Sequence, residues 1–102
     1  MIELRPTCEY CNSNLPANST DAMICSFECT FCKECVDNIL YNVCPNCGGG
    51  FTKRPIRPSE NHKNENYLGK YPASTVIKHK PVNIEQQLVF SNNIKSTPVN
   101  ER

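Results

Sequence analysis

Eight cysteines are the residues of this sequence whose type and spacing could do chemistry. All of them lie between residues 8 and 47 of the 102-residue chain, in the pattern C-x2-C-x13-C-x3-C-x2-C-x2-C-x8-C-x2-C. Two residues between paired cysteines let both thiolates reach one metal ion from a tight turn, and Zn²⁺ takes four sulfur or nitrogen ligands in structural sites. The spacing therefore predicts two structural Zn²⁺ ions with four thiolates each.

The eight ligands can be divided between two metal ions in two ways. In the sequential division, the first site takes Cys8, Cys11, Cys25 and Cys29, and the second takes Cys32, Cys35, Cys44 and Cys47. In the crossed division, zinc site 1 takes Cys8, Cys11, Cys32 and Cys35, and zinc site 2 takes Cys25, Cys29, Cys44 and Cys47.

The elements that position the cysteines favour the crossed division. A treble-clef zinc site has one cysteine pair on a knuckle and the other at the start of a helix, with a β-hairpin between them. Val36, Ile39 and Leu40 follow Cys35 at the spacing of one helical face, which predicts a short helix there. Three glycines follow Cys47 and disfavour a helix at that point. Cys32 and Cys35 are therefore assigned to the helix start.

A β-hairpin is expected to precede this helix. The segments before Cys25 and before Cys32 are rich in apolar, aromatic and β-branched residues, and Ser26-Phe27-Glu28 between them suits a hairpin tip. Leu15, Ile24 and Phe31 are expected in the core, and Phe51 is expected to pack back onto it. The fold class predicted is a small metal-stabilised α+β domain over residues 1–58.

The composition agrees with a small reduced domain. A domain of this size has a marginal apolar core and needs disulfides or metal. The N-terminal residues show neither a signal peptide nor a membrane span, so a cytoplasmic location is expected. Thiols stay reduced there, which favours metal ligands over disulfides, although oxidised pairs remain a minor alternative.

Charge divides the chain into an acidic and a basic half. Residues 1–47 carry six acidic and two basic side chains, whereas residues 48–102 carry nine basic and four acidic ones. From Ser59 on, Asn, Lys, Ser and Pro dominate, and residues 59–102 are predicted to form a mostly disordered basic tail. Residues 83–90 have a cap-box-like start and are expected to order as a helix only on a partner.

The stretch from Cys29 to Val36, followed by an apolar helix and Cys44-Pro45-Asn46-Cys47, resembles a RING finger. Cys29 stands where that family often has His, and the all-cysteine ligand set is a departure from it. Residues 1 to about 58 more closely resemble the bacterial domain-of-unknown-function family 1272, on the strength of Ile2–Pro6, Ile24–Cys32, Cys44–Gly49 and Arg54-Pro55. This resemblance implies a RING-like treble-clef fold with two cross-braced zinc ions, and no established activity.

The function predicted is a zinc-stabilised module that binds another protein, whose identity and stoichiometry the sequence does not specify. Four thiolates on each zinc leave no open position for the water that a catalytic zinc needs. No partnered Ser–His or Cys–His set and no phosphate-binding loop is present, so no catalytic residue is assigned. The chain is therefore interpreted as a binding protein rather than an enzyme.

Three alternatives remain open. Ubiquitin-ligase-like activity would use Tyr10, Ile39 and Pro45 as a docking groove, but Gly48 replaces the arginine that often follows the last ligand. An iron–sulfur or redox protein would explain Cys29-x2-Cys32-x2-Cys35, but the next cysteine comes eight residues later rather than three. Nucleic-acid binding is disfavoured and would fall to the tail, through Lys53, Arg54, Arg57, Lys63, Lys70, Lys78 and Lys80 with Tyr67 and Tyr71.

Overall fold

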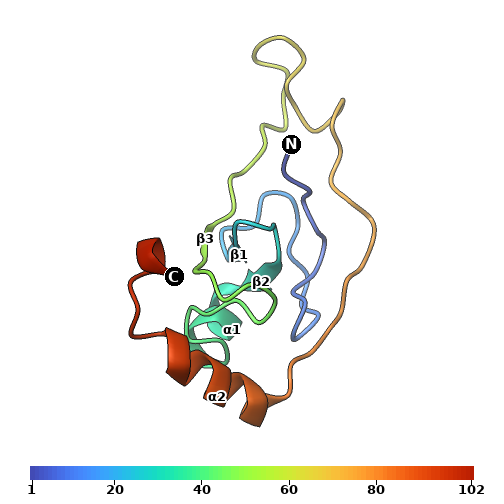
Figure 1. Ribbon diagram of the computed structural model, residues 1–102. Coiled ribbons are helices and arrows are strands. Elements are labelled where there is room, and N and C mark those ends of the chain that lie inside the picture. The colour runs from blue at the N-terminus through green and yellow to red at the C-terminus, as the bar shows by residue number, and fades with distance from the viewer.

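The computed structural model describes residues 1–102. Figure 1 shows the elements, which are in chain order β1 (Ala22–Ile24), β2 (Thr30–Cys32), α1 (Lys33–Asn38), β3 (Thr52–Lys53), α2 (Ile84–Ile94) and a short 3-10 helix (Val99–Glu101). The three strands form one small antiparallel sheet in the order β2-β1-β3, with α1 following β2 directly.

The β1–β2 pair is the hairpin expected around the central cysteines. Ala22 lies opposite Cys32 and Ile24 lies opposite Thr30, so the turn consists of residues 25–29. Glu28 has a φ of 65° in this turn, and the Cys25 amide donates to the Cys29 carbonyl at 3.2 Å. The hairpin prediction is confirmed. The third strand, β3, pairs with the other edge of β1 and was not anticipated.

The expected short helix is also present, at slightly different bounds. It begins at Lys33, directly after Cys32, and ends at Asn38. The chain cannot continue as a helix because Tyr41 and Asn42 adopt φ values of 51° and 57°. Its apolar face still points inward, since Val36 and Leu40 are buried.

The core of the head, which we define as residues 1–58, is small and consists partly of cysteines. The rings of Phe31 and Phe51 meet edge to face, with centroids 5.5 Å apart and planes at 80°. Leu15 and Ile24 are buried as expected. Five of the eight cysteines belong to the buried core cluster, namely Cys8, Cys25, Cys29, Cys35 and Cys44, and the partly buried Cys32 packs against it. The cysteine positions and the apolar core are therefore one structural unit.

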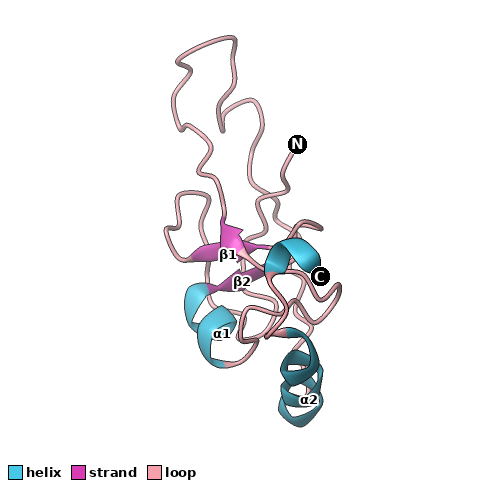
Figure 2. Cartoon of the chain, turned by 60° about the vertical axis from the view of Figure 1, so that its left-hand side comes forward, coloured by secondary structure: helices cyan, strands magenta, loops and turns pink.

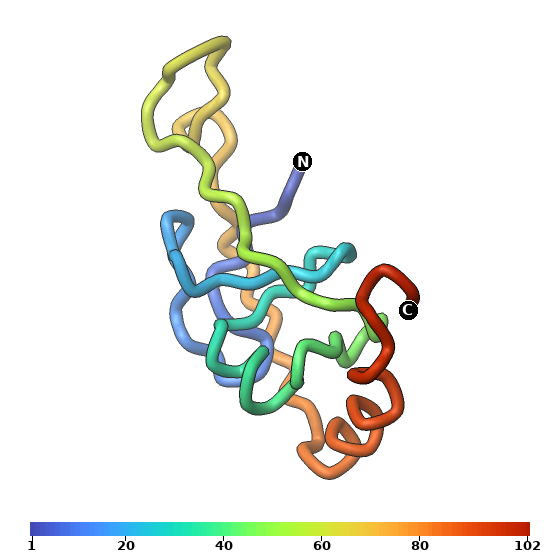
Figure 3. Tube along the Cα trace, turned by 90° about the vertical axis from the view of Figure 1, so that its left-hand side faces the viewer, coloured from blue at the N-terminus to red at the C-terminus, as the bar shows by residue number.

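The structure does not support the prediction that residues 59–102 form a mostly disordered tail. Residues 59–73 form a loop that projects from one end of the molecule, and the following residues return along the head to α2 (Figures 1 and 3). The Ser74 amide donates to the Leu4 carbonyl at 3.0 Å and the Lys80 amide to the Glu9 carbonyl at 2.8 Å. The polar composition suggested disorder, but the head itself supplies the contacts that order this segment.

The helix expected within the tail starts where its cap predicts. Asn83 is the N-cap of α2, and its side chain accepts a hydrogen bond from the Gln86 amide. The helix lies at the end of the molecule opposite the projecting loop, and the 3-10 helix then brings the C-terminus beside the head (Figure 2). The molecule measures 45 × 27 × 17 Å. Neither α1 nor α2 has the length and apolar character that crossing a bilayer requires.

Candidate metal centres

Four cysteines from two parts of the head converge in what we call cluster I: Cys8, Cys11, Cys32 and Cys35. Their Sγ atoms all lie within 4.8 Å of one another. The first pair lies on the N-terminal loop, and the second lies at the junction of β2 with α1. Cys11 Sγ and Cys32 Sγ are 3.8 Å apart. A tetrahedron of thiolates with Zn–S bonds of about 2.3 Å has edges of about 3.8 Å. The spacing of the thiols therefore suits one tetrahedral metal ion.

The electrostatic environment differs among the thiols of cluster I. Burial raises the pKa of Cys8 and that of Cys35 above the usual thiol range, with neighbouring cysteines adding to the effect at Cys35. Partial burial opposes ionisation at Cys11 too, but hydrogen bonds with Ser13, Cys8 and Cys32 lower its pKa to about 7. Buried thiolates without a cation are costly. A bound cation would remove that cost for Cys8 and Cys35.

Cluster II consists of Cys25, Cys44 and Cys47, whose Sγ atoms lie within 4.8 Å of one another. Cys25 comes from the β1–β2 turn, and the other two come from the loop between α1 and β3. Cys29 Sγ is not within this distance of all three, although the Cys29 thiol interacts with that of Cys25. Burial raises the pKa of Cys44 and that of Cys29, and neighbouring cysteines raise both further.

Nitrogen donors surround the sulfurs of cluster II. The Asn46 side-chain amide lies 3.4 Å from Cys29 Sγ. The Phe27 amide donates to Cys25 Sγ at 3.3 Å, and the Gly49 amide donates to Cys47 Sγ at 3.4 Å. Donors of this kind favour the charged thiolate over the thiol. The loops of cluster II therefore stabilise the thiolate form of these cysteines, which is the form that binds a metal ion.

A buried carboxylate links the first cysteine loop to the sheet. Glu9, between Cys8 and Cys11, accepts hydrogen bonds from the Thr30 amide at 2.7 Å and from Arg5 Nη1 at 2.8 Å. The Glu9 amide in turn donates to the Thr30 carbonyl at 3.0 Å. This pairing holds the loop of cluster I against β2, one residue after Cys29 and two before Cys32.

The structure also places residues whose role the sequence could not indicate. Glu9 was counted only as an acidic side chain, and its partners lie on separate segments. Ser13 lies two residues after Cys11, and Asn46 lies directly before Cys47. Their polar side chains close to a cysteine were the only signal available, and such residues are common in turns. Gly48 has a φ of 77°, which explains why glycine follows Cys47.

Two cations considered for nucleic-acid binding are engaged inside the protein. Arg54 is 3% exposed and donates to the backbone carbonyls of Arg5, Leu15 and Pro16. Burial lowers the pKa of its guanidinium. Arg57 donates to the carbonyls of Tyr71 and Ile2. These two side chains fasten the chain after β3 to the head and do not lie free on the surface.

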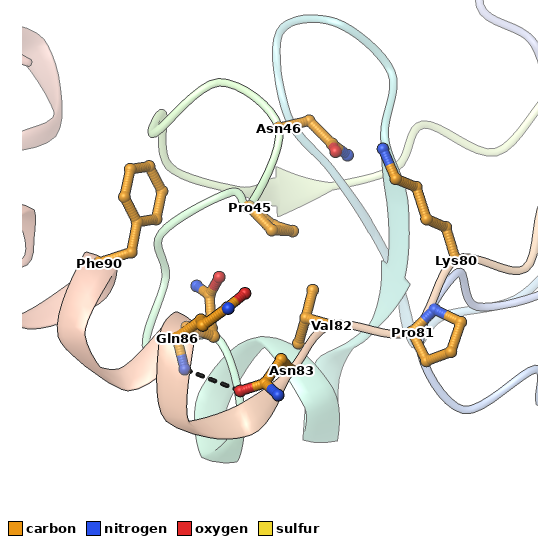
Figure 4. Close-up of a pocket in the computed structure, with 9 residues that line it drawn as sticks. Pro45, Asn46, Lys80, Pro81, Val82, Asn83, Gln86 and Phe90 are labelled. Carbon is orange, nitrogen blue, oxygen red and sulfur yellow. Dashed lines mark hydrogen bonds between the residues drawn. The ribbon is translucent and has the colours of Figure 1, made fainter.

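The positions that the RING resemblance assigns to a docking groove have neighbours from the C-terminal half. Tyr10 and Ile39 are partly buried and pack against the same core cluster as Val82. Pro45 and Asn46 line one side of a pocket of about 280 Å³, and residues 80–83, Gln86, Gln87 and Phe90 line the other. Figure 4 shows Val82 lying between Pro45 and the helix behind it, with the Lys80 side chain directed toward Asn46.

The donor set and its geometry fit zinc. Thiolates are soft ligands that select Zn²⁺, Cu⁺ or iron–sulfur clusters, and a closed tetrahedral S₄ set is typical of structural zinc. All eight cysteines are free thiols in the structure. The 3.8 Å separation of Cys11 Sγ and Cys32 Sγ is well above the roughly 2.05 Å of a disulfide. Cluster I already has the four converging sulfurs of a tetrahedral site, and cluster II would have them if Cys29 Sγ moved toward the other three.

Comparison with known proteins places these features in a family. Residues 1–57 match the family model described as "Protein of unknown function (DUF1272)". An uncharacterised protein of Rhizobium meliloti (strain 1021) is 52% identical over 81 residues, which are 79% of this chain and 89% of that protein. Because the family match has 57 residues, at least 24 of the aligned residues lie beyond it. The similarity therefore extends into the segment that returns to the head. No solved structure matches the chain.

Proposed function

We propose that this chain, which belongs to the DUF1272 family of proteins of unknown function, is a module held together by two structural Zn²⁺ ions that binds another protein. The convergence of Cys8, Cys11, Cys32 and Cys35 within 4.8 Å carries this proposal, because they come from two separate parts of the head. In the proposal, these four residues hold zinc 1, and Cys25, Cys29, Cys44 and Cys47 hold zinc 2.

The second site requires one adjustment. Cys29 would turn its sulfur toward the other three, starting from its present interaction with the Cys25 thiol. Asn46 would follow, since its side-chain amide donates to Cys29 Sγ. The two sites would then form the crossed brace of a RING-like treble clef, with the β1–β2 hairpin contributing to both.

The role of the metal in this proposal is structural. Apparent zinc-binding free energies of about 10–16 kcal/mol exceed the roughly 5–15 kcal/mol stability of a typical domain. Four thiolates on each ion leave no coordination position for a substrate or an activated water. The surface that the metal orders, rather than the metal, would therefore do the biological work. The proposed location is a compartment that keeps thiols reduced, which favours the cytoplasm.

The alternative functions have weaker support. Ubiquitin-ligase-like docking would need an open groove, but Tyr10 and Ile39 are partly buried against the core cluster, and Pro45 lines a pocket with residues of the C-terminal segment. An iron–sulfur protein would be coloured, whereas zinc is not, so visible absorbance of the pure protein separates the two. A discharge assay with a charged ubiquitin-conjugating enzyme tests the former directly.

Affinity capture with the full chain tests the binding role. The tagged protein would be used zinc-loaded, after metal removal, and as the Cys32→Ser variant. We expect one protein to be retained by the zinc-loaded chain at near-stoichiometric amounts and to be lost at least ten-fold in both other forms. Re-addition of zinc should restore capture by the wild-type chain only. Equal capture by all three forms, or capture of nothing, would contradict the binding role.

A further inference from the structure

The C-terminal segment, residues 79–102, contacts the loops of both cysteine clusters. At its start, His79 Nε2 lies 3.0 Å from the Tyr10 carbonyl, and the Lys80 amide donates to the Glu9 carbonyl at 2.8 Å. Further on, Gln87 Nε2 donates to the Val43 carbonyl at 3.0 Å. The segment therefore spans the space between the loop that carries Cys8 and Cys11 and the loop that carries Cys44 and Cys47.

One apolar side chain is inserted at the centre of this contact. Val82 is partly buried and packs against the core cluster of the head, as Tyr10 and Ile39 do. Immediately after it, Asn83 caps α2 and turns the extended chain into a helix. Figure 4 shows this change of direction beside Pro45. The groove thus receives an extended stretch with a β-branched anchor, followed by the first turn of a helix.

The contact made by α2 differs from the packing of an ordinary core helix. Its buried side chains are Gln87 and Ser91, which are polar. Ile84, Leu88 and Val89 on the same helix are exposed, at 54%, 44% and 63%. A helix that is part of a core buries its apolar face. This helix is held instead by the hydrogen bond from Gln87 to Val43 and by limited apolar contact. Such a contact is typical of a bound peptide that can dissociate.

Charge and tether length agree with a ligand of this kind. The segment enters the groove with Lys78, His79 and Lys80, and Lys78 Nζ lies 3.7 Å from Glu3 of the head. The head is acidic, and eight thiolates on two Zn²⁺ would add four more negative charges. Residues 59–78 connect the two parts without any helix or strand. A tether of that length costs little more to close than a shorter one and keeps the segment attached to the head when it leaves the groove.

We propose that the groove between the two cysteine loops is a peptide-binding site and that residues 79–94 of this chain are its resident, displaceable ligand. A partner protein would displace it by presenting the same chemistry: a basic extended stretch, a β-branched residue in the place of Val82, and an Asn-capped helix with Gln one turn in. The inference rests on the proposed binding role and gives that role a location and a ligand class.

A peptide competition experiment on the full chain tests this assignment. The probe is a fluorescein-labelled peptide of residues 77–96, titrated by fluorescence polarisation into the wild-type chain and into the Val82→Asp and Gln87→Ala variants. Val89→Asp is the matched control, because Val89 lies on α2 but is exposed. Zinc content and amide spectra of each sample report whether the head is folded.

We expect the peptide to bind Val82→Asp and Gln87→Ala at least ten-fold more tightly than the wild-type chain, because their own segments compete less well. Val89→Asp should behave as wild type, and a peptide carrying Val82→Asp should bind none of them. Binding should weaken as salt is raised. Equal affinity for all folded chains, no binding to any, or dimers formed by exchange of segments between copies would overturn the assignment. Fewer than two zinc ions per chain would contradict the proposed metal sites without deciding the peptide result.

Discussion

Cluster I takes its cysteines from the N-terminal loop and the β2–α1 junction, whereas cluster II takes them from the β1–β2 turn and the loop before β3. In cluster I, all four sulfurs lie within 4.8 Å of one another. In cluster II, three do, and Cys29 lies aside. The thiols of cluster II are nevertheless the more buried ones. In cluster I, neither Cys11 nor Cys32 is buried, whereas in cluster II only Cys47 is exposed.

The difference shows that convergence and burial of the ligands have separate causes. The head positions cluster I by itself, since Glu9 joins its loop to β2 through Thr30. The loop of cluster II is also supported by the C-terminal segment, through the bond from Gln87 to Val43 and the contact of Val99 with Gly50. A Cβ at Gly50 would lie 2.7 Å from Val99 Cγ2, so a larger residue at this position would force Val99 to shift. Cluster I therefore stabilises the head, and cluster II lies where the head contacts the C-terminal segment.

The comparison predicts unequal effects when one ligand is removed from each cluster. Cys32→Ser should cost one zinc ion and unfold much of the head, because it removes the metal that ties the N-terminal loop to the β2–α1 junction. Cys47→Ser should also cost one zinc ion, but the head should keep its β1–β2 hairpin, because zinc 1 and the C-terminal segment remain. Metal analysis and amide spectra measure both effects. If Cys47→Ser unfolds the head as fully as Cys32→Ser does, the two clusters are equivalent braces.

A medium effect is expected at the support of cluster I. Glu9→Gln keeps the size of the side chain but removes the charge that faces Arg5 and the strong acceptor for the Thr30 amide. Removing a buried charge-assisted hydrogen bond costs about 1–3 kcal/mol. Urea unfolding of the zinc-loaded protein should show a loss of this size. Glu60→Gln is the control, because Glu60 is exposed in the projecting loop. A loss there equal to that of Glu9→Gln would contradict a special role for Glu9.

The smallest effect is expected at the support of cluster II. Asn46→Ala removes one side-chain donor to Cys29 Sγ at a solvent-exposed position. A single hydrogen bond of this kind contributes about 0.5–1.5 kcal/mol. We expect zinc 2 to be released faster to a chelator while zinc 1 is released at the wild-type rate. Faster release of zinc 1 as well would show that the two sites are coupled more tightly than their geometry suggests.

The sequence predicted the cysteine-rich head well because its signals are local. The hairpin, the short helix after Cys32 and the core positions of Leu15, Phe31 and Phe51 follow from residue type and spacing. The four sulfurs of cluster I are the set of the crossed division. The crossed division was chosen over the sequential one because a helical pattern follows Cys35 and three glycines follow Cys47. Both signals lie within a few residues of these cysteines.

The C-terminal half could not be predicted because its order comes from distant contacts. Val82, Gln87 and Arg102 contact residues that are far away in the sequence, and nothing in their immediate neighbours indicates this. The apolar side chains of α2 are exposed and give only a weak helical pattern, and the face that α2 buries is polar. No hydrophobic periodicity therefore indicated that α2 packs against the head. The cap at Asn83 was the one local feature, and it placed the start of the helix correctly.

Native mass spectrometry of the freshly purified, reduced chain tests the central claim most directly. The two-cluster account predicts two zinc ions per chain, no visible absorbance, and one zinc ion in each of the Cys32→Ser and Cys47→Ser variants. A wild-type chain with one zinc ion or none, or with intramolecular disulfides in place of metal, would contradict it.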